Sequence, residues 1–279
     1  MHLLTDPLQY VFMQRALIGS IAVAVLASVV GTFVILRRLA FIGEGLAHGS
    51  LAGLAIGQLL NWNLYLAGNI YTVALAFFIG YLHEKAKVSM DTAIGIIFST
   101  SMALGVALIS ATKSSSTNLT GYLFGSVLSI SSLDLVIIIT CASAILLILT
   151  IFYKEFLYYA FDPELAEVSG LPREGLHYAM LAIIAVTVVV ASQTVGIILV
   201  TALLTIPAAS AFQWTHSLKK LVLLAVIFGL TSAIFGLYLS YYLNVASGAS
   251  IALTSALIFF FSYLFSPKRV SLKRSFGRG

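Results

Sequence analysis

The amino-acid sequence predicts an all-α, polytopic transmembrane helix bundle with about nine membrane spans. Of its 279 residues, 60% are hydrophobic and only 9% are charged, whereas about 25% of the residues in a soluble domain are charged. The mean hydropathy is +1.05. Because so few charges cannot keep a water-facing surface polar, a lipid bilayer is the solvent that fits this chain. No polar segment is long enough to fold separately, so we expect residues 1–279 to form one membrane domain.

Nine apolar stretches are each about 20 residues long, which is the length of one membrane crossing. They cover residues 12–36, 40–60, 64–83, 91–111, 133–153, 176–193, 196–213, 219–243 and 247–266. A further apolar piece, residues 119–128, is too short to cross and is predicted to be re-entrant or interfacial. The polar break inside 176–213 is minimal, and one long helix there would reduce the count to eight spans.

The positions of lysine and arginine predict the orientation. If Arg37 and Arg38 face the cytoplasm, nine crossings leave only Arg15 and Lys113 among the basic residues on the other side. Basic loops favour the cytoplasmic side of a membrane, so we expect the N-terminus outside and the C-terminus in the cytoplasm. The basic C-terminal tail is expected to bind anionic lipid. A net charge of +5 distributed in this way does not indicate a nucleic-acid partner, and we expect none.

One pair of ionisable residues lies inside a predicted span rather than at its end. Glu44 and His48 are four residues apart in the second span, so they share one face of a helix. Ionisable groups inside a membrane are costly and usually functional. A carboxylate and an imidazole at this spacing can bind one cation such as Mn, Fe or Zn. The alternative is a local Glu–His hydrogen bond that neutralises both groups.

A ridge of four glycines, Gly45, Gly49, Gly53 and Gly57, runs beside this pair. Small residues at this spacing allow another helix to approach closely. In a two-fold dimer, an isologous contact would bring two Glu44 and two His48 side chains together. The alternative is that the glycines only pack the bundle within one chain.

The loop after the fifth predicted span is expected to contain a short helix over about residues 162–170. Its Asp-Pro-Glu start supplies an N-cap, a proline at the first helical position and a charge that complements the helix dipole. A later glycine suits the left-handed position after the helix. Such a helix can dock into a groove on a cytoplasmic partner, and an ordinary loop helix is the alternative. The residues concerned are Asp162, Pro163, Glu164, Leu165, Ala166 and Gly170.

Pro207 lies inside the seventh predicted span, where it removes a backbone donor and predicts a kink. We expect the hydroxyl groups of Thr205 and Ser210 to satisfy the carbonyl groups that the proline frees. The segment is either a flexible lining of a pathway or a static bend. His177 lies at the end of its predicted span and is expected to be a surface residue.

No energy source is encoded in this chain. The phosphate-binding pattern G-x-x-x-x-G-K-[ST] needs a glycine followed by lysine, and this sequence has no such pair. We therefore expect no enzymatic activity in this chain. If ATP drives a transport reaction, the ATPase is a separate subunit.

Several short motifs follow one another along the chain: residues 35–38 (ILRR), 42–48 (IGEGLAH), 91–96 (DTAIGI), 121–125 (GYLFG), 162–166 (DPELA), 195–200 (VGIILV) and 207–209 (PAA). In this order they resemble the membrane permease subunit of the zinc/manganese/iron family of bacterial ABC importers, which work with cluster A-I metal-binding lipoproteins. The resemblance covers nearly the full length, and residues 244–248 look most like the manganese branch.

The resemblance implies a homodimer around a central pathway in the bacterial cytoplasmic membrane, with two cytoplasmic ATP-binding subunits and an extracytoplasmic metal-binding lipoprotein. It implies that Glu44 and His48 are linked to metal passage and that residues 162–170 form the coupling helix. It also implies that no cofactor is tightly bound and that Mn²⁺ or Zn²⁺, and less so iron, is the transported substrate. This chain departs from the family in having Glu44 where Asp is usual, and Ala52 where manganese members often carry proline.

Two other classes of function stay open at this point. In a secondary, proton-coupled metal transporter, Glu44 and His48 would relay protons and no ATPase would be needed. An intramembrane metalloenzyme would usually need a larger His/Glu cluster than this chain supplies.

Overall fold

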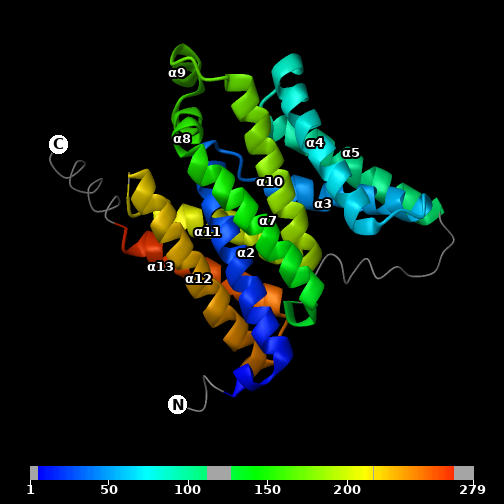
Figure 1. Ribbon diagram of the computed structural model, residues 1–279, viewed down its shortest axis with the longest axis vertical. Coiled ribbons are helices and arrows are strands. Elements are labelled where there is room, and N and C mark those ends of the chain that lie inside the picture. The colour runs from blue at the N-terminus through cyan, green and yellow to red at the C-terminus, as the bar shows by residue number, and fades with distance from the viewer. Residues whose placement is uncertain (1–5, 112–126, 216, 267–279) are drawn as a thin grey trace.

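The computed structural model describes residues 6–111, 127–215 and 217–266, and these residues form only helices and connecting loops (Figure 1). Most of the apolar piece predicted at 119–128, and nearly all of the basic tail, lie outside the described residues. The α-helices are α2 (Val11–Leu36), α3 (Ile42–Leu59), α4 (Leu64–Ala86), α5 (Met90–Ala111), α7 (Ser132–Ile151), α8 (Tyr153–Phe161), α9 (Pro163–Val168), α10 (Arg173–Val195), α11 (Ile197–Phe212), α12 (Leu218–Leu243) and α13 (Ser247–Leu264), with short 3-10 helices η1 (Pro7–Gln9) and η2 (Val127–Ser129).

The described residues contain seven helices that are long and apolar enough to cross a membrane, which confirms an all-helical membrane protein. A helix lies at every one of the nine predicted ranges. Two of these helices are not among the seven. Helix α11 is too short, with 16 residues. Helix α3 has 18 residues, but two ionisable side chains make it less apolar. Nine crossings and the placement of the termini therefore stay predictions.

The helical conformation is interrupted between α10 and α11 at Gly196. Its backbone has φ +94° and ψ 156°, a region that is open essentially only to glycine. The amide of Gly196 still bonds to the carbonyl oxygen of Ser192 at 3.0 Å, so α10 ends there. The alternative of one long helix over residues 176–213 is therefore wrong.

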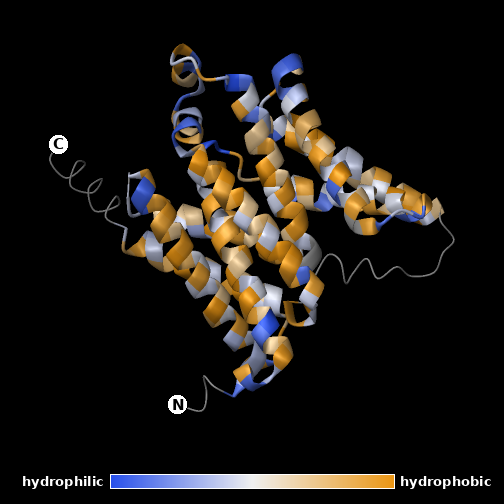
Figure 2. Ribbon diagram, viewed as in Figure 1, coloured by the Kyte–Doolittle hydropathy of each residue, from blue (hydrophilic) through white to orange (hydrophobic). Residues whose placement is uncertain are grey.

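Two groups of helices meet in the bundle, and α10 packs against both. Helix α2 packs against α7, α11 and α12, while α3 packs against α4 and α5. Hydrophobic residues cover most of the helices, whereas hydrophilic segments gather at α8, α9 and the neighbouring end of α4 (Figure 2). We call this end, which also holds the first turn of α10, the α8–α9 end.

Backbones touch where α2 crosses α11. A Cβ atom on Gly31 would lie 1.9 Å from the carbonyl oxygen of Leu204. Backbone atoms cannot swing aside as the tip of a side chain can, so only glycine permits this crossing. The crossing fixes α11, which carries Thr201 and Thr205, against α2.

We predict that Gly31→Ala destabilises the fold by about 1–3 kcal/mol, the usual range for overpacking, because the new methyl group meets the backbone of α11. The control is Gly95→Ala, since a Cβ atom at Gly95 in α5 meets no atom of the described residues within 4 Å. Both substitutions raise helix propensity equally. Thermal unfolding in detergent should show a lower midpoint for Gly31→Ala only; equal midpoints for both variants would contradict the predicted contact.

Candidate functional site

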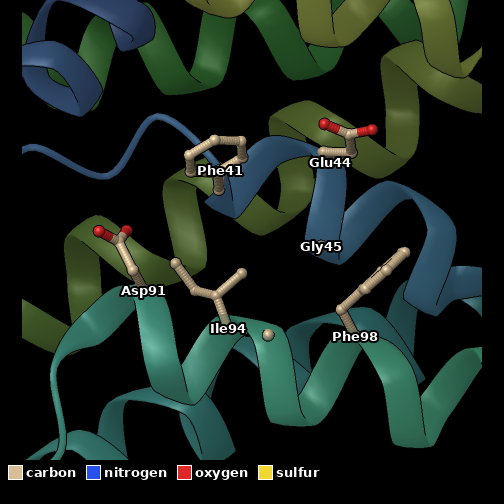
Figure 3. Close-up of a pocket in the computed structure, with 7 residues that line it drawn as sticks. Phe41, Glu44, Gly45, Asp91, Ile94 and Phe98 are labelled. Carbon is tan, nitrogen blue, oxygen red and sulfur yellow. The ribbon is translucent and has the colours of Figure 1, made fainter.

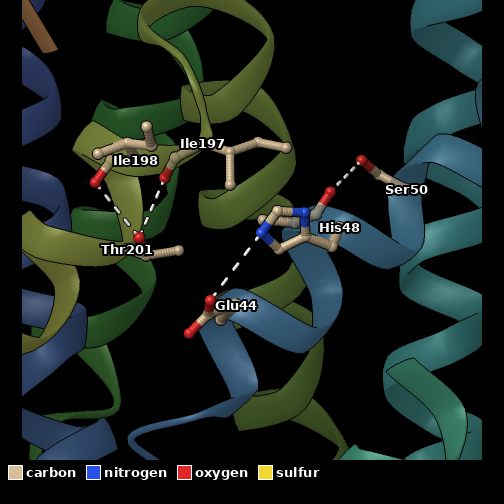
Figure 4. A network of polar contacts seen from close by, with 7 residues as sticks. Glu44, His48, Ser50, Ile197, Ile198 and Thr201 are labelled. Atoms are coloured by element: carbon tan, nitrogen blue, oxygen red, sulfur yellow. Dashed lines mark hydrogen bonds and ion pairs between the residues drawn. The ribbon is translucent and has the colours of Figure 1, made fainter. Parts of the chain in front are cut away.

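Glu44 and His48 lie on the first two turns of α3. Glu44 is in the first turn, where the helix dipole favours a negative charge. The His48 Nε2 atom lies 4.0 Å from the Glu44 Oε1 atom (Figure 4). Hydrogen bonds from nitrogen to oxygen span about 2.7–3.2 Å. The neutralising Glu–His hydrogen bond considered from the sequence is therefore not formed, although the two groups lie within the distance of an ion pair.

The imidazole of His48 packs against an aromatic ring, and its Nε2 atom lies beside Glu44. Its ring meets the ring of Phe98 edge-on, with centroids 5.8 Å apart and an interplanar angle of 73°. The Nδ1 atom is buried and has no hydrogen-bond partner among the described residues. The His48 side chain is 26% exposed and that of Glu44 is 57% exposed. The pair thus sits at an accessible surface of α3.

Glu44 lines two separate cavities. One, of about 300 Å³, lies between α3 and α5, where Glu44 shares the wall with Asp91, Phe41 and Phe98 (Figure 3). The other, of about 370 Å³, lies between α3 and α11, where Thr201 and Thr205 form the facing wall. A carboxylate that borders both spaces can interact with a cation in either one.

The pair can supply part of a metal site. Ligand bonds to Zn²⁺ are about 2.0–2.2 Å long, so two ligands of one ion lie at most about 4.4 Å apart. A separation of 4.0 Å between Nε2 and Oε1 meets that limit. Among the residues that the structure describes, no group of three or more His, Cys, Asp or Glu could hold a metal ion. One chain therefore offers two ligands, fewer than a closed site needs.

The glycine ridge lies against α4 and α5 of the same chain. A Cβ atom on any of the four glycines would come within 2.8 Å of a neighbouring side chain. The partners are Ile94 of α5 for Gly45, Leu75 of α4 for Gly49, Tyr71 of α4 for Gly53 and Ala67 of α4 for Gly57. In this structure the glycine ridge packs against helices of the same chain. This is the alternative in which the glycines only pack the bundle and need no second copy.

The hydroxyl groups of α11 bond to their own helix. Thr205 Oγ1 donates to the Thr201 carbonyl oxygen at 2.9 Å, and Ser210 Oγ donates to that of Ile206 at 2.8 Å. Pro207 lacks the amide that would bond to the carbonyl oxygen of Leu203. Neither hydroxyl bonds to that oxygen, so the expectation that they satisfy the carbonyl freed by the proline was wrong. Thr205 lines the cavity beside Glu44, whereas Pro207 is buried.

Helix α9 has both ends closed by hydrogen bonds. Asp162 Oδ1 accepts from the amides of Glu164 at 3.0 Å and Leu165 at 3.1 Å, and Pro163 is the first helical residue. At the other end, Gly170 has φ +81°. The amides of residues 170 and 171 bond to the carbonyl oxygens of residues 167 and 166, which is the Schellman arrangement. The helix is therefore fixed as a short projection.

The outer surface of α9 carries two exposed apolar side chains beside the exposed Glu164 and Glu167. Val168 is 87% exposed and Leu165 is 52% exposed, whereas Ala166 is fully buried against the bundle. Arg173 Nη1 pairs with Glu167 Oε2 at 3.1 Å. Apolar side chains on a firmly held projection suit insertion into a groove of another protein.

The structure adds residues that the sequence pattern missed. Asp91, predicted only to lie at a span end, faces the same cavity as Glu44. His177, expected at the surface, is only 8% exposed, and its Nδ1 atom lies 2.6 Å from the hydroxyl of Tyr159. No local periodicity reveals these placements, because each depends on contacts between different helices.

Comparisons with known proteins find relatives that match nearly the whole length of this chain. Residues 9–266 match the family described as ABC 3 transport family. The manganese transport system membrane protein MntC of Listeria innocua is 44% identical over 262 residues, or 94% of this chain and 93% of that protein. The manganese import system permease protein ScaB of Streptococcus gordonii is 40% identical over 263 residues, or 94% of each chain.

A solved structure has the same fold. PsaBC from Streptococcus pneumoniae, determined in complex with Fab, contains a chain that superimposes with a TM-score of 0.86 at 36% identity. The match covers 98% of this chain and 99% of that one.

Proposed function

The chain belongs to the ABC 3 transport family, and on that premise we propose that it is the permease of an ATP-driven importer of a divalent transition metal. It resides in the bacterial cytoplasmic membrane. The relatives from Listeria and Streptococcus are named for manganese, which supports Mn²⁺ as the first candidate substrate, ahead of Zn²⁺ and iron. The metal is cargo, and no tightly bound cofactor is required.

The Glu44–His48 pair carries this proposal. One oxygen and one nitrogen ligand lie 4.0 Å apart without a hydrogen bond between them, and Glu44 lines the two cavities beside α3. An oxygen–nitrogen set suits Mn, Fe and Zn. Two chains related by a two-fold axis would supply four such ligands, so we propose a homodimer with the metal route on its axis.

The two cavities beside Glu44 supply the remainder of the route. Glu44 and Asp91 place negative charge on one cavity, which favours a divalent cation. Thr201 and Thr205 line the other and are the pathway residues of α11, beside the Pro207 segment. The metal passes from Glu44 and His48 through these spaces.

The energy comes from a partner. We place the α8–α9 end in the cytoplasm and the N-terminus outside. Helix α9 docks into a groove of a cytoplasmic ATP-binding subunit. Each chain of the dimer binds one such subunit. The exposed Leu165 and Val168 side chains provide the apolar contact. An extracytoplasmic metal-binding lipoprotein delivers the metal on the opposite side.

We predict that Glu44→Gln and His48→Ala each abolish ATP-dependent uptake of Mn²⁺ while the complex with the ATPase stays assembled. Each variant removes one ligand; because losing even an outer-shell partner of a ligand costs about 10- to 100-fold, losing the ligand itself should cost at least as much. Uptake of radioactive Mn²⁺ into proteoliposomes measures this effect. Asp6→Asn is the control, since it removes an exposed carboxylate just before η1 that makes no capping hydrogen bond.

Glu44→Asp adds a test of geometry to this experiment. The shorter side chain keeps the carboxylate, so we expect uptake to persist with an altered ratio of Mn²⁺ to Zn²⁺. Normal uptake in both Glu44→Gln and His48→Ala would reject the site. Uptake by the chain alone, driven by a proton gradient without ATP, would instead support a secondary transporter.

We predict that Val168→Asp weakens binding of the ATPase by about tenfold or more, equivalent to about 1.4 kcal/mol, because it places a charge in the apolar contact of α9. Val245→Asp is the control: Val245 is 49% exposed, and it follows α12 close to Tyr241, whose ring contacts Tyr10 just before α2. It thus lies at the end opposite α9. Co-purification with the ATPase measures the effect, and equal yields for both variants would exclude α9 as the docking helix.

A further inference from the structure

Three side chains from distant parts of the chain meet behind α9. The hydroxyl of Tyr159 in α8 lies 2.6 Å from Nδ1 of His177 in α10. The guanidinium carbon of Arg37, at the end of α2, lies 4.6 Å from the centre of the Tyr159 ring. Arg37 Nη2 also lies 3.5 Å from the Tyr159 hydroxyl. Tyr159 is 2% exposed, so the cluster is closed to water at its centre.

Arginine can only donate, so the Tyr159 oxygen accepts from Arg37. In the bond between the Tyr159 hydroxyl and Nδ1 of His177, the donor is set by the tautomer of the histidine. Burial raises the pKa of Tyr159 above its usual value, against the lowering effect of Arg37, and the phenol keeps its proton. The Nε2 atom of His177 has no hydrogen-bond partner among the described residues. Tyr159 is therefore the group that joins the other two.

The two contacts of Tyr159 differ in stiffness. The bond to His177 is short, and a second link, the ion pair between Glu167 and Arg173 at 3.1 Å, also ties the α9 segment to α10. The 3.5 Å contact from Arg37 is longer than the usual range for a hydrogen bond from nitrogen to oxygen, and a cation over a ring can slide without losing its attraction. Helices α8, α9 and the start of α10 thus form one unit, and Arg37 is the joint between this unit and α2.

Each side of the joint leads directly to a functional segment. Tyr159 is three residues before Asp162, the cap of α9. Arg37 caps the end of α2, and the short loop after it leads to Phe41 and Glu44, which both line the two cavities. A shift of α9 that moves Tyr159 therefore acts on the loop that positions Glu44.

We propose that the Arg37–Tyr159–His177 cluster transmits the movement of α9 to the Glu44 cavities, with Tyr159 as a positioning residue for transport. This inference rests on the function proposed above. A purely structural role of Tyr159 would affect ATP hydrolysis and Mn²⁺ uptake together, whereas the role proposed here sets how much Mn²⁺ is transported for each ATP hydrolysed. The proposal assigns no change to the metal ligands or to the docking helix.

The test uses the full complex with ATPase and binding protein in proteoliposomes, with radioactive Mn²⁺ as the probe. For Tyr159→Phe we expect ATP hydrolysis within about twofold of wild type but Mn²⁺ uptake per ATP lower by at least about fivefold, the low end of coupling between sites. Tyr158→Phe is the matched control. It removes the same atom from the adjacent residue, whose side chain is 48% exposed, and should leave the ratio unchanged.

A double-mutant cycle adds a second criterion. Arg37→Ala should lower the ratio as Tyr159→Phe does, whereas Arg38→Ala at the exposed neighbouring position should not. Because both residues act in one chain of contacts, the double variant should be little worse than either single variant. A wild-type ratio in Tyr159→Phe, a parallel loss of hydrolysis and uptake, or fully multiplicative effects would overturn the inference. Absence of ATP-dependent uptake by the wild-type complex would overturn the proposed function as well.

Discussion

The close contact of α3 with α4 and α5 is the constraint on which the candidate site depends. Side chains of both neighbours occupy the positions where Cβ atoms of the four ridge glycines would lie. That face of α3 is therefore filled, and Glu44 and His48 lie beside the cavities that remain. Helix α3 also falls outside the helices that length and composition alone would place across a membrane. Its polar residues are held in the bundle by packing against protein rather than by transfer into lipid.

An incomplete site in each chain is compatible with transport. A site that conducts an ion must bind it well enough for entry and weakly enough for release. Two ligands from one chain, separated by 4.0 Å and bordered by open cavities, meet the second requirement. Ligands from a second copy would meet the first. Helix movement can then change affinity by changing the distance between the chains, without altering any ligand.

Rigidity at the α8–α9 end complements this openness. A helix of six residues is not stable alone in water. Asp162 caps one end of α9, the turn at Gly170 closes the other, and the buried Ala166 anchors it to the bundle. A rigid projection transmits force where a flexible loop would absorb it. The short Tyr159–His177 bond extends that rigid unit into α10.

The sequence alone determined the membrane class, the positions of the nine helical ranges, both ends of α9 and the shared face of Glu44 and His48. These features follow from composition, helical spacing and the backbone preferences of Asp, Pro and Gly, all of which act over a few residues. Tertiary structure decided that the ridge packs within the chain, that Asp91 shares a cavity with Glu44 and that His177 is buried. These outcomes depend on which helices meet, and in an apolar bundle many pairings satisfy the same local pattern. Only side-chain packing between specific helices selects among them.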